Sequence, residues 1–317
     1  MAPRIVTLTL NPAVDLAWEA ENVRPTHKVR TRSEHYDPGG GGLNIARVVR
    51  ELGGESLAVL LSGGVTGMFL QDLLTESGQP FRNIPIDGRT RLSVTVHDRS
   101  DNLEYRFVPE GPEITEAEWR SALHAVDIAD ADWVVASGSL PRGVPEDIYR
   151  RLAVATARRG RRFVVDTSGP ALTAALGSGV TLIKPSLNEF ETLVGRKLPD
   201  RREQAEAASG LVRAGASEMI AVSLGADGAL LVTRAGAWHV AALPVTVLST
   251  VGAGDSFVAA MTLALARGEP AEDTFVCGVA AGTSAVMHYG TARPDRAEVE
   301  RLHATLIQGV RQIPLSV

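Results

Sequence analysis

Thr250-Val251-Gly252-Ala253-Gly254-Asp255 leads directly into the apolar run 256–261, Ser-Phe-Val-Ala-Ala-Met. The two glycines allow a tight turn and leave backbone amides unobstructed where a helix begins. The first N–H groups of a helix lack partners and its dipole is positive at that end, so such a start attracts anions. A carboxylate in an anion site suits proton removal from a hydroxyl while the amides hold a phosphoryl group in transfer. The alternative is a glycine-rich turn in which Asp255 caps the helix.

Composition limits the class of protein. The 317 residues suffice for one large α/β domain or two ordinary ones, and 44% hydrophobic with 22% charged residues is typical of a globular protein. A net charge of −5 gives no basic footprint for nucleic acid. Cys277 is the one cysteine, which excludes an intrachain disulfide and a cysteine metal cluster. Because no apolar run reaches the length of a membrane span, we expect a soluble cytoplasmic enzyme with no membrane partner.

Short β-branched runs alternate with helical patterns along most of the chain. Several of these runs are apolar throughout, which suits strands that are covered on both faces. The expected strands are Ile5–Leu10, Ser56–Leu61, Trp133–Ser137, Arg162–Asp166, Thr181–Lys184, Met219–Ser223 and Ala229–Thr233, and the expected helices are Leu43–Leu52, Glu116–Val126, Glu146–Arg158, Arg202–Ala214 and Ser256–Arg267. The alternation predicts a parallel sheet between two helical layers, a three-layer α/β/α sandwich.

Two stretches, at about 16–36 and 88–108, interrupt this alternation. Thr90–His97 alternates apolar with polar residues, and the same alternation continues at Leu103, Tyr105 and Phe107 after a turn-like segment. This pattern predicts a hairpin with one apolar face, whose neighbouring strands would come from Trp18–Val23 and Val29–Tyr36. We interpret the two stretches as a small β-sheet lid that closes over a ligand or packs on a second copy of the chain.

A glycine run, Gly39-Gly40-Gly41-Gly42, opens the first expected helix. It is not a P-loop, since no Lys-Ser/Thr pair follows, and it fails the dinucleotide fingerprint because Asn44 stands at the position of the third glycine. The glycines allow a ligand to approach the backbone, and Asn44 offers both donors and an acceptor to a polyhydroxy ligand. A flexible turn with an asparagine cap is the alternative interpretation.

Asp15 follows the first expected strand in the segment Asn11-Pro12-Ala13-Val14-Asp15. The carboxyl ends of strands are where α/β sheets hold ligands, so Asp15 is a candidate for binding sugar hydroxyls, with an ordinary turn residue as the alternative. Lys28, Arg30 and Arg91 lie in or beside the expected lid. They are either solvated edge charges or the cations that bind a phosphorylated substrate.

Small polar loops follow other expected strands, at Ser137–Pro141, Lys184-Pro185 and Ser223–Gly228. The last of these could wrap nucleotide phosphates with its amides, although each loop alone is a weak signal. The histidines lack metal-ligand spacing, and we assign them to surface or core roles. The only metal implied is Mg²⁺ that accompanies a nucleotide. Ser137 and Ser139 have no histidine nearby in the sequence, so a hydrolase triad is unsupported.

Taken together, these residues resemble the ribokinase (PfkB-type) family of carbohydrate kinases. Gly39–Arg47 and Thr250–Asp255 are similar to the two signatures of that family, in the same order and at a similar separation. The resemblance implies one ribokinase-like catalytic domain over residues 1–317, with the lid described above and a homodimer formed through it. Within the family the chain is most similar to the minor 6-phosphofructokinase branch. 1-Phosphofructokinases and tagatose-6-phosphate kinases commonly carry lysine where Gly42 stands here.

The resemblance also implies roles for particular residues. Asp255 would be the base, with the amides of Gly252, Ala253 and Gly254 as the anion hole. The sugar would be held by Asp15, Gly40, Gly41, Asn44 and Ser139, and its phosphate by Lys28 and Arg91. ATP would lie against Lys184, Ser186, Ser223, Gly225, Gly228 and Thr250. Glu189 would help to hold Mg²⁺ through water, in an element where Ser186 replaces the family's asparagine, and K⁺ is a further candidate cofactor.

The activity implied is transfer of the γ-phosphoryl group of ATP to the 1-hydroxyl of fructose 6-phosphate, giving fructose 1,6-bisphosphate and ADP. A tagatose-6-phosphate kinase, a 1-phosphofructokinase or a kinase of an unphosphorylated sugar or nucleoside is an alternative within the same chemistry. A non-catalytic sugar-phosphate sensor and a nicotinamide dehydrogenase are alternatives from other classes. The intact glycine-Asp255 motif argues against the sensor, and the missing dinucleotide fingerprint argues against the dehydrogenase.

Overall fold

Buried β-branched runs form the centre of the larger of two sheets. The computed structural model describes residues 4–288 and 294–314. Within them, the larger sheet has the strand order β14 (Arg311–Ile313), β13 (Gly236–Val240), β12 (Ala229–Thr233), β11 (Met219–Ser223), β10 (Leu182–Ile183), β9 (Arg162–Asp166), β8 (Trp133–Ser137), β1 (Arg4–Thr9), β4 (Glu55–Ser62) and β5 (Phe81–Pro85). The strands from β11 to β5 run parallel, and β12, β13 and β14 are antiparallel. The expected strands are confirmed, although β10 is shorter than the Thr181–Lys184 segment.

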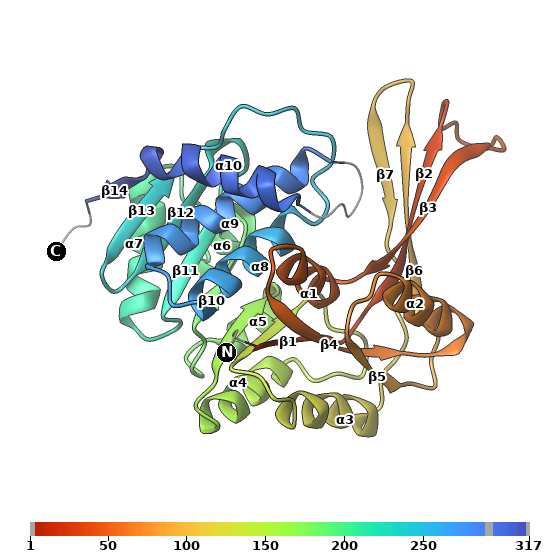
Figure 1. The fold of residues 1–317 in the computed structure, drawn as a ribbon, viewed down its shortest axis with the longest axis horizontal. Coiled ribbons are helices and arrows are strands. Elements are labelled where there is room, and N and C mark those ends of the chain that lie inside the picture. The colour runs from red at the N-terminus through yellow and green to blue at the C-terminus, as the bar shows by residue number, and fades with distance from the viewer. Residues whose placement is uncertain (1–3, 289–293, 315–317) are drawn as a thin grey trace.

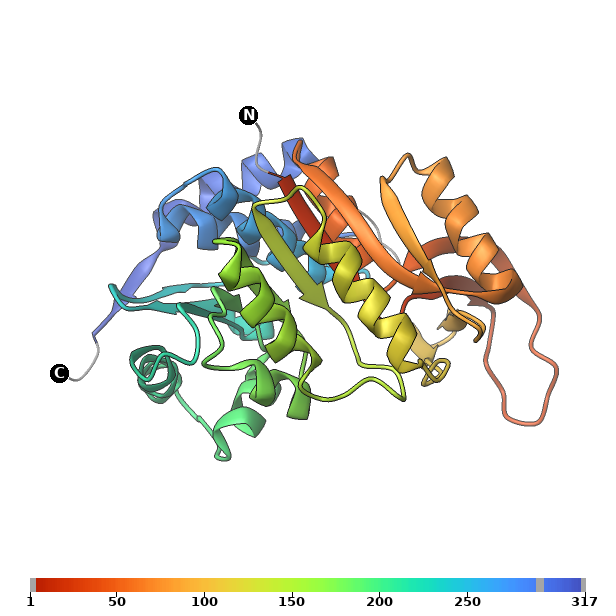
Figure 2. The same ribbon diagram turned by 90° about the horizontal axis from the view of Figure 1, so that it is seen from below.

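Helices cover both faces of this sheet (Figures 1 and 2). One face carries α1 (Gly41–Glu51), α8 (Ala253–Ala266), α9 (Ala271–Val286) and α10 (Arg296–Leu306), and the other carries α3 (Glu116–Asp127), α4 (Ile148–Arg158), α5 (Gly169–Ala175), α6 (Leu187–Val194) and α7 (Arg201–Arg213). A separate apolar core fills each interface, because alternate residues of each strand point to opposite faces. The prediction of a three-layer α/β/α sandwich is confirmed.

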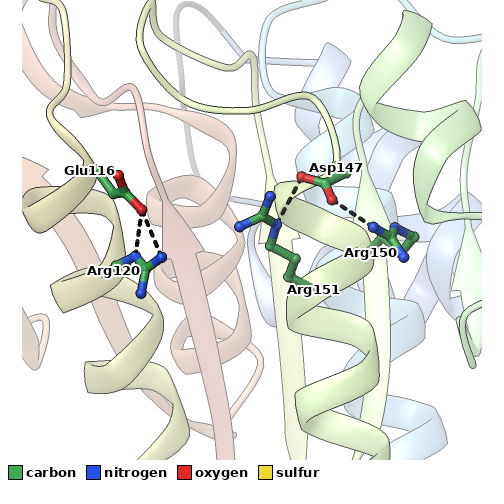
Figure 3. Close-up of polar contacts among 5 residues, drawn as sticks. All are labelled: Glu116, Arg120, Asp147, Arg150 and Arg151. Carbon is green, nitrogen blue, oxygen red and sulfur yellow. Dashed lines mark hydrogen bonds and ion pairs between the residues drawn. The ribbon is translucent and has the colours of Figure 1, made fainter.

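The outer faces of α3 and α4 are charged. Glu116 pairs with Arg120 one turn later, and Asp147 pairs with both Arg150 and Arg151, at 2.6 to 2.8 Å (Figure 3). Exposed pairs at this spacing contribute only about 0.3–0.5 kcal/mol each, so the apolar faces against the sheet hold these helices in place. These arginines are therefore a solvated surface rather than a ligand site.

The second sheet is the predicted lid, with the strand order β3 (Thr31–Gly39), β2 (Ala13–Ala20), β6 (Arg91–Asp98) and β7 (Leu103–Phe107). It projects from the end of the molecule that carries α2 (Gly64–Glu76) and β5, as Figure 1 shows. The expected hairpin is confirmed as β6 and β7.

The position expected for Asp15 is wrong. Asp15 does not lie in a loop after β1 but is the third residue of lid strand β2, which pairs with β3 on one side and β6 on the other. The alternation of Val14 and Leu16 with Asp15 and Ala17 continues into the body of the protein, so the strand starts earlier than the interruption at residue 16 suggested.

The two faces of the lid differ in polarity. On one face Leu16, Trp18, Tyr36 and Val94 pack in a cluster with leucines of α2. Beyond this cluster Leu92, Leu103 and Phe107 are exposed. The opposite face is polar and turns toward the loop that precedes α8. Among the described residues, no helix is both long and apolar enough to cross a membrane.

Candidate active site

The turn before α8 brings unpaired amides to one point. Gly252 caps the helix with a φ of 78°, a left-handed conformation that favours glycine. The first backbone hydrogen bond of the helix runs from the amide of Ser256 to the carbonyl of Gly252 at 2.8 Å. The amides of Ala253, Gly254 and Asp255 precede that bond, so they are available to an anion at the positive end of the helix.

Asp255 lies in this first turn and points toward α1. Its Oδ2 accepts a hydrogen bond of 2.9 Å from Nδ2 of Asn44. Burial raises the pKa of Asp255 to about 7, and the nearby Asp166 carboxylate contributes to the increase, while Asn44 and Lys184 act in the opposite direction. A carboxylate with this pKa accepts a proton efficiently near neutral pH.

The glycine run passes between Asp255 and Asp15. A Cβ atom on Gly41 would lie 3.1 Å from Oδ1 of Asp255 and 2.1 Å from Oγ of Ser137. A Cβ atom on Gly39 would lie 2.3 Å from the carboxylate of Asp15. Gly40, between them, has a φ of 119°, which L side chains rarely adopt. The backbone of the run therefore approaches both carboxylates as closely as a glycine allows.

A cavity of about 210 Å³ lies under the polar face of the lid. It is lined by Asp15, Leu16, Ala17, Trp18, Glu19, Ser33, His35, Asp37, Ser93, Thr95, His97, Glu104, Arg106, Ser249 and Val251. Burial raises the pKa of Asp15 to about 6, and Asp37 adds to the increase. Polar groups converging beside a concave wall are typical of a small-molecule site.

The basic residues are placed differently from the sequence-based expectation. Arg91 donates from Nη1 to the carbonyl of Pro109 at 2.9 Å and from Nη2 to that of Asn11 at 2.8 Å, so it also braces two loops of the site. Lys28 is exposed on the 21–30 loop between β2 and β3, and it does not line the cavity of its own chain. Arg106 on β7 does line it, and its charge lowers the pKa of Asp15.

Sequence reasoning missed Arg106, and it assigned His35 and His97 only to surface or core roles. The structure corrects that assignment, because both histidines line the cavity. The alternation of apolar and polar residues in β6 and β7 predicts two faces of the hairpin. The same pattern that predicts the apolar face also puts Arg106 on the polar face, beside the cavity.

Asn11 and Ser139 close the side of the site near β8. Nδ2 of Asn11 donates to the carbonyl of Glu110 at 2.8 Å and to Oγ of Ser139 at 3.3 Å. Oδ1 of Asn44 is buried without a hydrogen-bond partner among the described residues. Because buried acceptors are normally paired, that oxygen is suited to a ligand hydroxyl.

Lys184 carries positive charge to the start of α8. Its Nζ lies 3.6 Å from Oδ1 of Asp166, and a Cβ atom on Gly254 would lie 3.3 Å from Nζ. Burial raises the pKa of Asp166, and Lys184 opposes that increase. Asp166 was not predicted as a site residue, although its place at the end of β9 is the same signal that selected Lys184 after β10.

Ser186 and Glu189 form a capping box at the start of α6. Oε2 of Glu189 accepts from the amide of Ser186 at 2.7 Å and from its hydroxyl at 2.8 Å. The negative charge of Glu189 also raises the pKa of Asp166. No cluster of three metal-ligating side chains occurs in the part of the chain that the structure describes. Mg²⁺ commonly takes one or two carboxylates together with phosphate oxygens, and Asp166 and Glu189 fit that pattern.

The loop after β11 is held against β13. Gly225 and Gly228 have positive φ values of 61° and 94°, and a Cβ atom on Gly228 would lie 1.9 Å from the carbonyl oxygen of Val240. Nε2 of His239 lies 2.8 Å from the carbonyl of Asp227. Ser223 pairs with Ser186 through an isolated bridge, and Thr250 is exposed just before the turn that opens α8. The loop is therefore well held, with its amides at the same edge of the sheet as Lys184.

The fold and this arrangement define the class of protein. A buried carboxylate with a raised pKa at the start of a helix, beside a polar cavity and an ammonium group, suits phosphoryl transfer to an alcohol in an α/β/α enzyme with a lid. The model of the pfkB family carbohydrate kinases matches residues 8–298, and the chain belongs to that family. It is a phosphotransferase that acts on an alcohol group of a sugar.

Known proteins of similar sequence and structure agree with this class. ATP-dependent 6-phosphofructokinase isozyme 2 of Mycobacterium tuberculosis is 45% identical over 301 residues, covering 94% of this chain and 88% of that protein. 1-Phosphofructokinase of Escherichia coli is 33% identical over 311 residues, covering 96% and 97%. Structures of Escherichia coli phosphofructokinase-2 in complex with potassium and with fructose-6-phosphate match with TM-scores of 0.92 and 0.90, at 38% and 37% identity. Each match covers 96% of this chain and 99% of the other.

Proposed function

We propose that this protein transfers the γ-phosphoryl group of ATP to the 1-hydroxyl of fructose 6-phosphate. The observation that carries the proposal is Asp255, a buried carboxylate with a raised pKa among free amides at the start of α8. Asp255 takes the proton of the hydroxyl as the sugar oxygen bonds to the γ-phosphorus. The bond to the β–γ bridging oxygen breaks, and ADP leaves with that oxygen. The amides of Gly252, Ala253 and Gly254 receive the charge on the transferring group.

The sugar would lie between the glycine run and the lid. The carboxylate of Asp15 and the free Oδ1 of Asn44 are acceptors for its hydroxyls. Gly40 and Gly41 leave room for it, and Ser139 lies on the β8 side. Arg91 and Arg106 would hold the sugar phosphate: Arg106 lines the cavity, and the charges of both arginines act on Asp15 and lower its pKa.

The nucleotide would extend from Lys184 along the loop Ser223–Gly228. Lys184 lies against Gly254, at the point where the β- and γ-phosphates must come to meet Asp255. Gly225 has open space where a side chain would be, so its backbone can be approached closely. Thr250 and Ser186 lie at the two sides of this path. When bound, Mg²⁺ supplies charge neutralisation of the phosphates, with Asp166 and Glu189 as the residues that would hold it.

The decisive measurement is kcat/KM over a panel of acceptors with ATP and Mg²⁺. We expect fructose 6-phosphate to exceed tagatose 6-phosphate, fructose 1-phosphate, unphosphorylated fructose and a nucleoside by at least about tenfold. The likeness to 1-phosphofructokinase makes fructose 1-phosphate the most useful competitor. A higher kcat/KM for it would replace the proposed substrate, whereas ATP turnover with none of these acceptors would overturn the proposal altogether.

Three further proposals concern the activating ion, the oligomeric state and the location of the enzyme. The likeness to a structure in complex with potassium supports K⁺ as an activating ion, which a comparison of turnover in K⁺ and in tetramethylammonium salts would test. The exposed apolar side chains of the lid support a homodimer formed through this sheet. Since ATP and phosphorylated sugars are held inside cells, we propose the cytoplasm as its location.

A further inference from the structure

Arg47 of α1 is a buried cation that the proposed reaction does not use. Its side chain is only 5% exposed. Nη1 donates to the carbonyl of Pro38 at 3.1 Å, and Nη2 pairs with Oδ1 of Asp37 at 3.0 Å. Both partners belong to lid strand β3. Because a buried charge is costly unless it is paired, Arg47 and Asp37 depend on each other.

Asp37 faces a second carboxylate. Asp15 and Asp37 are direct cross-strand partners in β2 and β3, and both line the cavity under the lid. Like charges opposite each other destabilise a strand pair. The other oxygen of Asp37, Oδ2, lies 3.1 Å from Nε2 of His35. Arg47 therefore provides a permanent positive charge that is directly bonded to Asp37, one of these two carboxylates.

The electrostatic effect reaches Asp15. Asp37 raises the pKa of Asp15, and the charges of Arg91, Arg106 and Arg47 lower it. Arg91 and Arg106 can be drawn to the phosphate of a bound sugar, which then neutralises their charge. Arg47 lies beneath the sheet with its guanidinium fixed on β3, so its compensation of Asp37 persists when the cavity is filled.

We infer that Arg47 is a positioning residue of the sugar site. Its guanidinium neutralises Asp37 and so allows Asp15, directly across the strand pair, to stay ionised and accept hydrogen bonds from the sugar. Arg47 touches no substrate. It also stands one turn after Asn44 on α1, so the helix that contacts Asp255 is the one that secures the lid carboxylates. This inference rests on the proposed function, because it takes the cavity under the polar face of the lid as the site that binds the sugar.

The kinetic test compares Arg47→Met with the double variant Arg47→Met/Asp37→Asn. Leaving Asp37 without its counterion should raise the KM for fructose 6-phosphate by about tenfold, the equivalent of one pKa unit in binding, and should leave the KM for ATP within about twofold. The double variant removes both charges and should return the sugar KM to within about threefold of the wild type. An unchanged sugar KM in Arg47→Met, or a double variant as impaired as the single one, would overturn the inference.

Thermal unfolding provides a readout that does not depend on activity. Arg47→Met should lower Tm by about 5 °C or more, because it removes the permanent charge that pairs with the largely buried carboxylate of Asp37. Arg47→Met/Asp15→Asn should recover part of that loss by removing the opposing charge, and no recovery would contradict the inference. If Arg47→Met folds poorly, Arg47→Lys serves in its place. Because lysine keeps the positive charge, the sugar KM of Arg47→Lys should lie nearer to the wild-type value than that of Arg47→Met. Absence of sugar kinase activity in the wild type would refute the proposed function while leaving this unfolding test valid.

Discussion

At the scale of single residues, the proposed mechanism depends on Asp255 as the base. Asp255→Asn keeps the size of the side chain and an oxygen that can accept from Asn44, which now contacts it at 2.9 Å. The amide cannot take a proton, so kcat should fall by about 10² to 10⁴ while the KM values change little. Steady-state kinetics with both substrates would check this, with circular dichroism to confirm folding. Near-normal turnover would remove Asp255 from the mechanism.

Asp255→Asn should lower activity but raise the stability of the folded protein. The pKa of Asp255 rises from 3.8 to about 7 on folding, so between these values the folded state binds more protons than the unfolded state. Stability is therefore lost as pH rises through this range. We expect Asp255→Asn to raise Tm by a few degrees at pH 8 and to have little effect near pH 4. Equal shifts at both pH values would contradict the raised pKa.

Residue types at motif positions were predictable from the sequence, whereas their partners were not. The glycines and Asp255 could be recognised because a helix start needs small residues and a base needs a carboxylate. That Asn44 would bond Asp255 across 211 positions, or that Asp15 would oppose Asp37, depends on how α1 and the lid strands pack. Such contacts are set by tertiary structure, and local pattern carries no signal for them.

At the scale of elements, the predicted strands and helices of the main sheet lie within a few residues of the observed ones, whereas α2, α5, α6, α9 and α10 were not predicted and the first strand of the lid was predicted to start too late. Trp133–Ser137 and Arg162–Asp166 agree with β8 and β9 because the central residues of both strands form continuous apolar runs that are buried on both faces. Strand β2 starts at Ala13 rather than Trp18, since its first residues belong to the body and its last to the lid. Because β2 passes from the body of the protein into the lid, its residues do not follow one pattern of apolar and polar positions, and its first residue could not be predicted from that pattern.

The loop after β11 illustrates how an element is held by its neighbour. Burial lowers the pKa of His239, so its ring is neutral and Nε2 donates to the carbonyl of Asp227. His239→Ala should release the turn Gly225–Asp227. The KM for ATP should then rise by about fivefold, the equivalent of one such bond, while the KM for the sugar stays unchanged. His239→Gln, which keeps an N–H donor, is the matched control. Equal increases in the KM values for ATP and for the sugar would instead indicate that the substitution destabilises the whole protein and not this turn alone.

At the scale of the whole molecule, the sheet of the lid leaves a surface that one chain does not cover. Helix α2 shields the apolar face near its base, but Leu103 and Phe107 are 54% and 60% exposed on β7. Their strand is at the edge of the sheet, where exposed apolar residues invite pairing with another chain. A second lid is the proposed cover, because it presents the same apolar surface and makes a closed, self-complementary contact.

Phe107→Asp should convert the proposed dimer to a monomer, since a charge placed in an apolar interface stays hydrated only when the two lids separate. Light scattering coupled to size-exclusion chromatography should give a mass of about 67 kDa for the wild type, twice the 33.6 kDa of one chain, and half that mass for the variant. Ile128→Asp is the control, because Ile128 is similarly exposed at 52% but follows α3, on the other part of the molecule. A wild type that elutes as a monomer would show that the apolar face of the lid is exposed to solvent, and an Ile128→Asp control that dissociates as completely as Phe107→Asp would contradict a dimer formed through the lid.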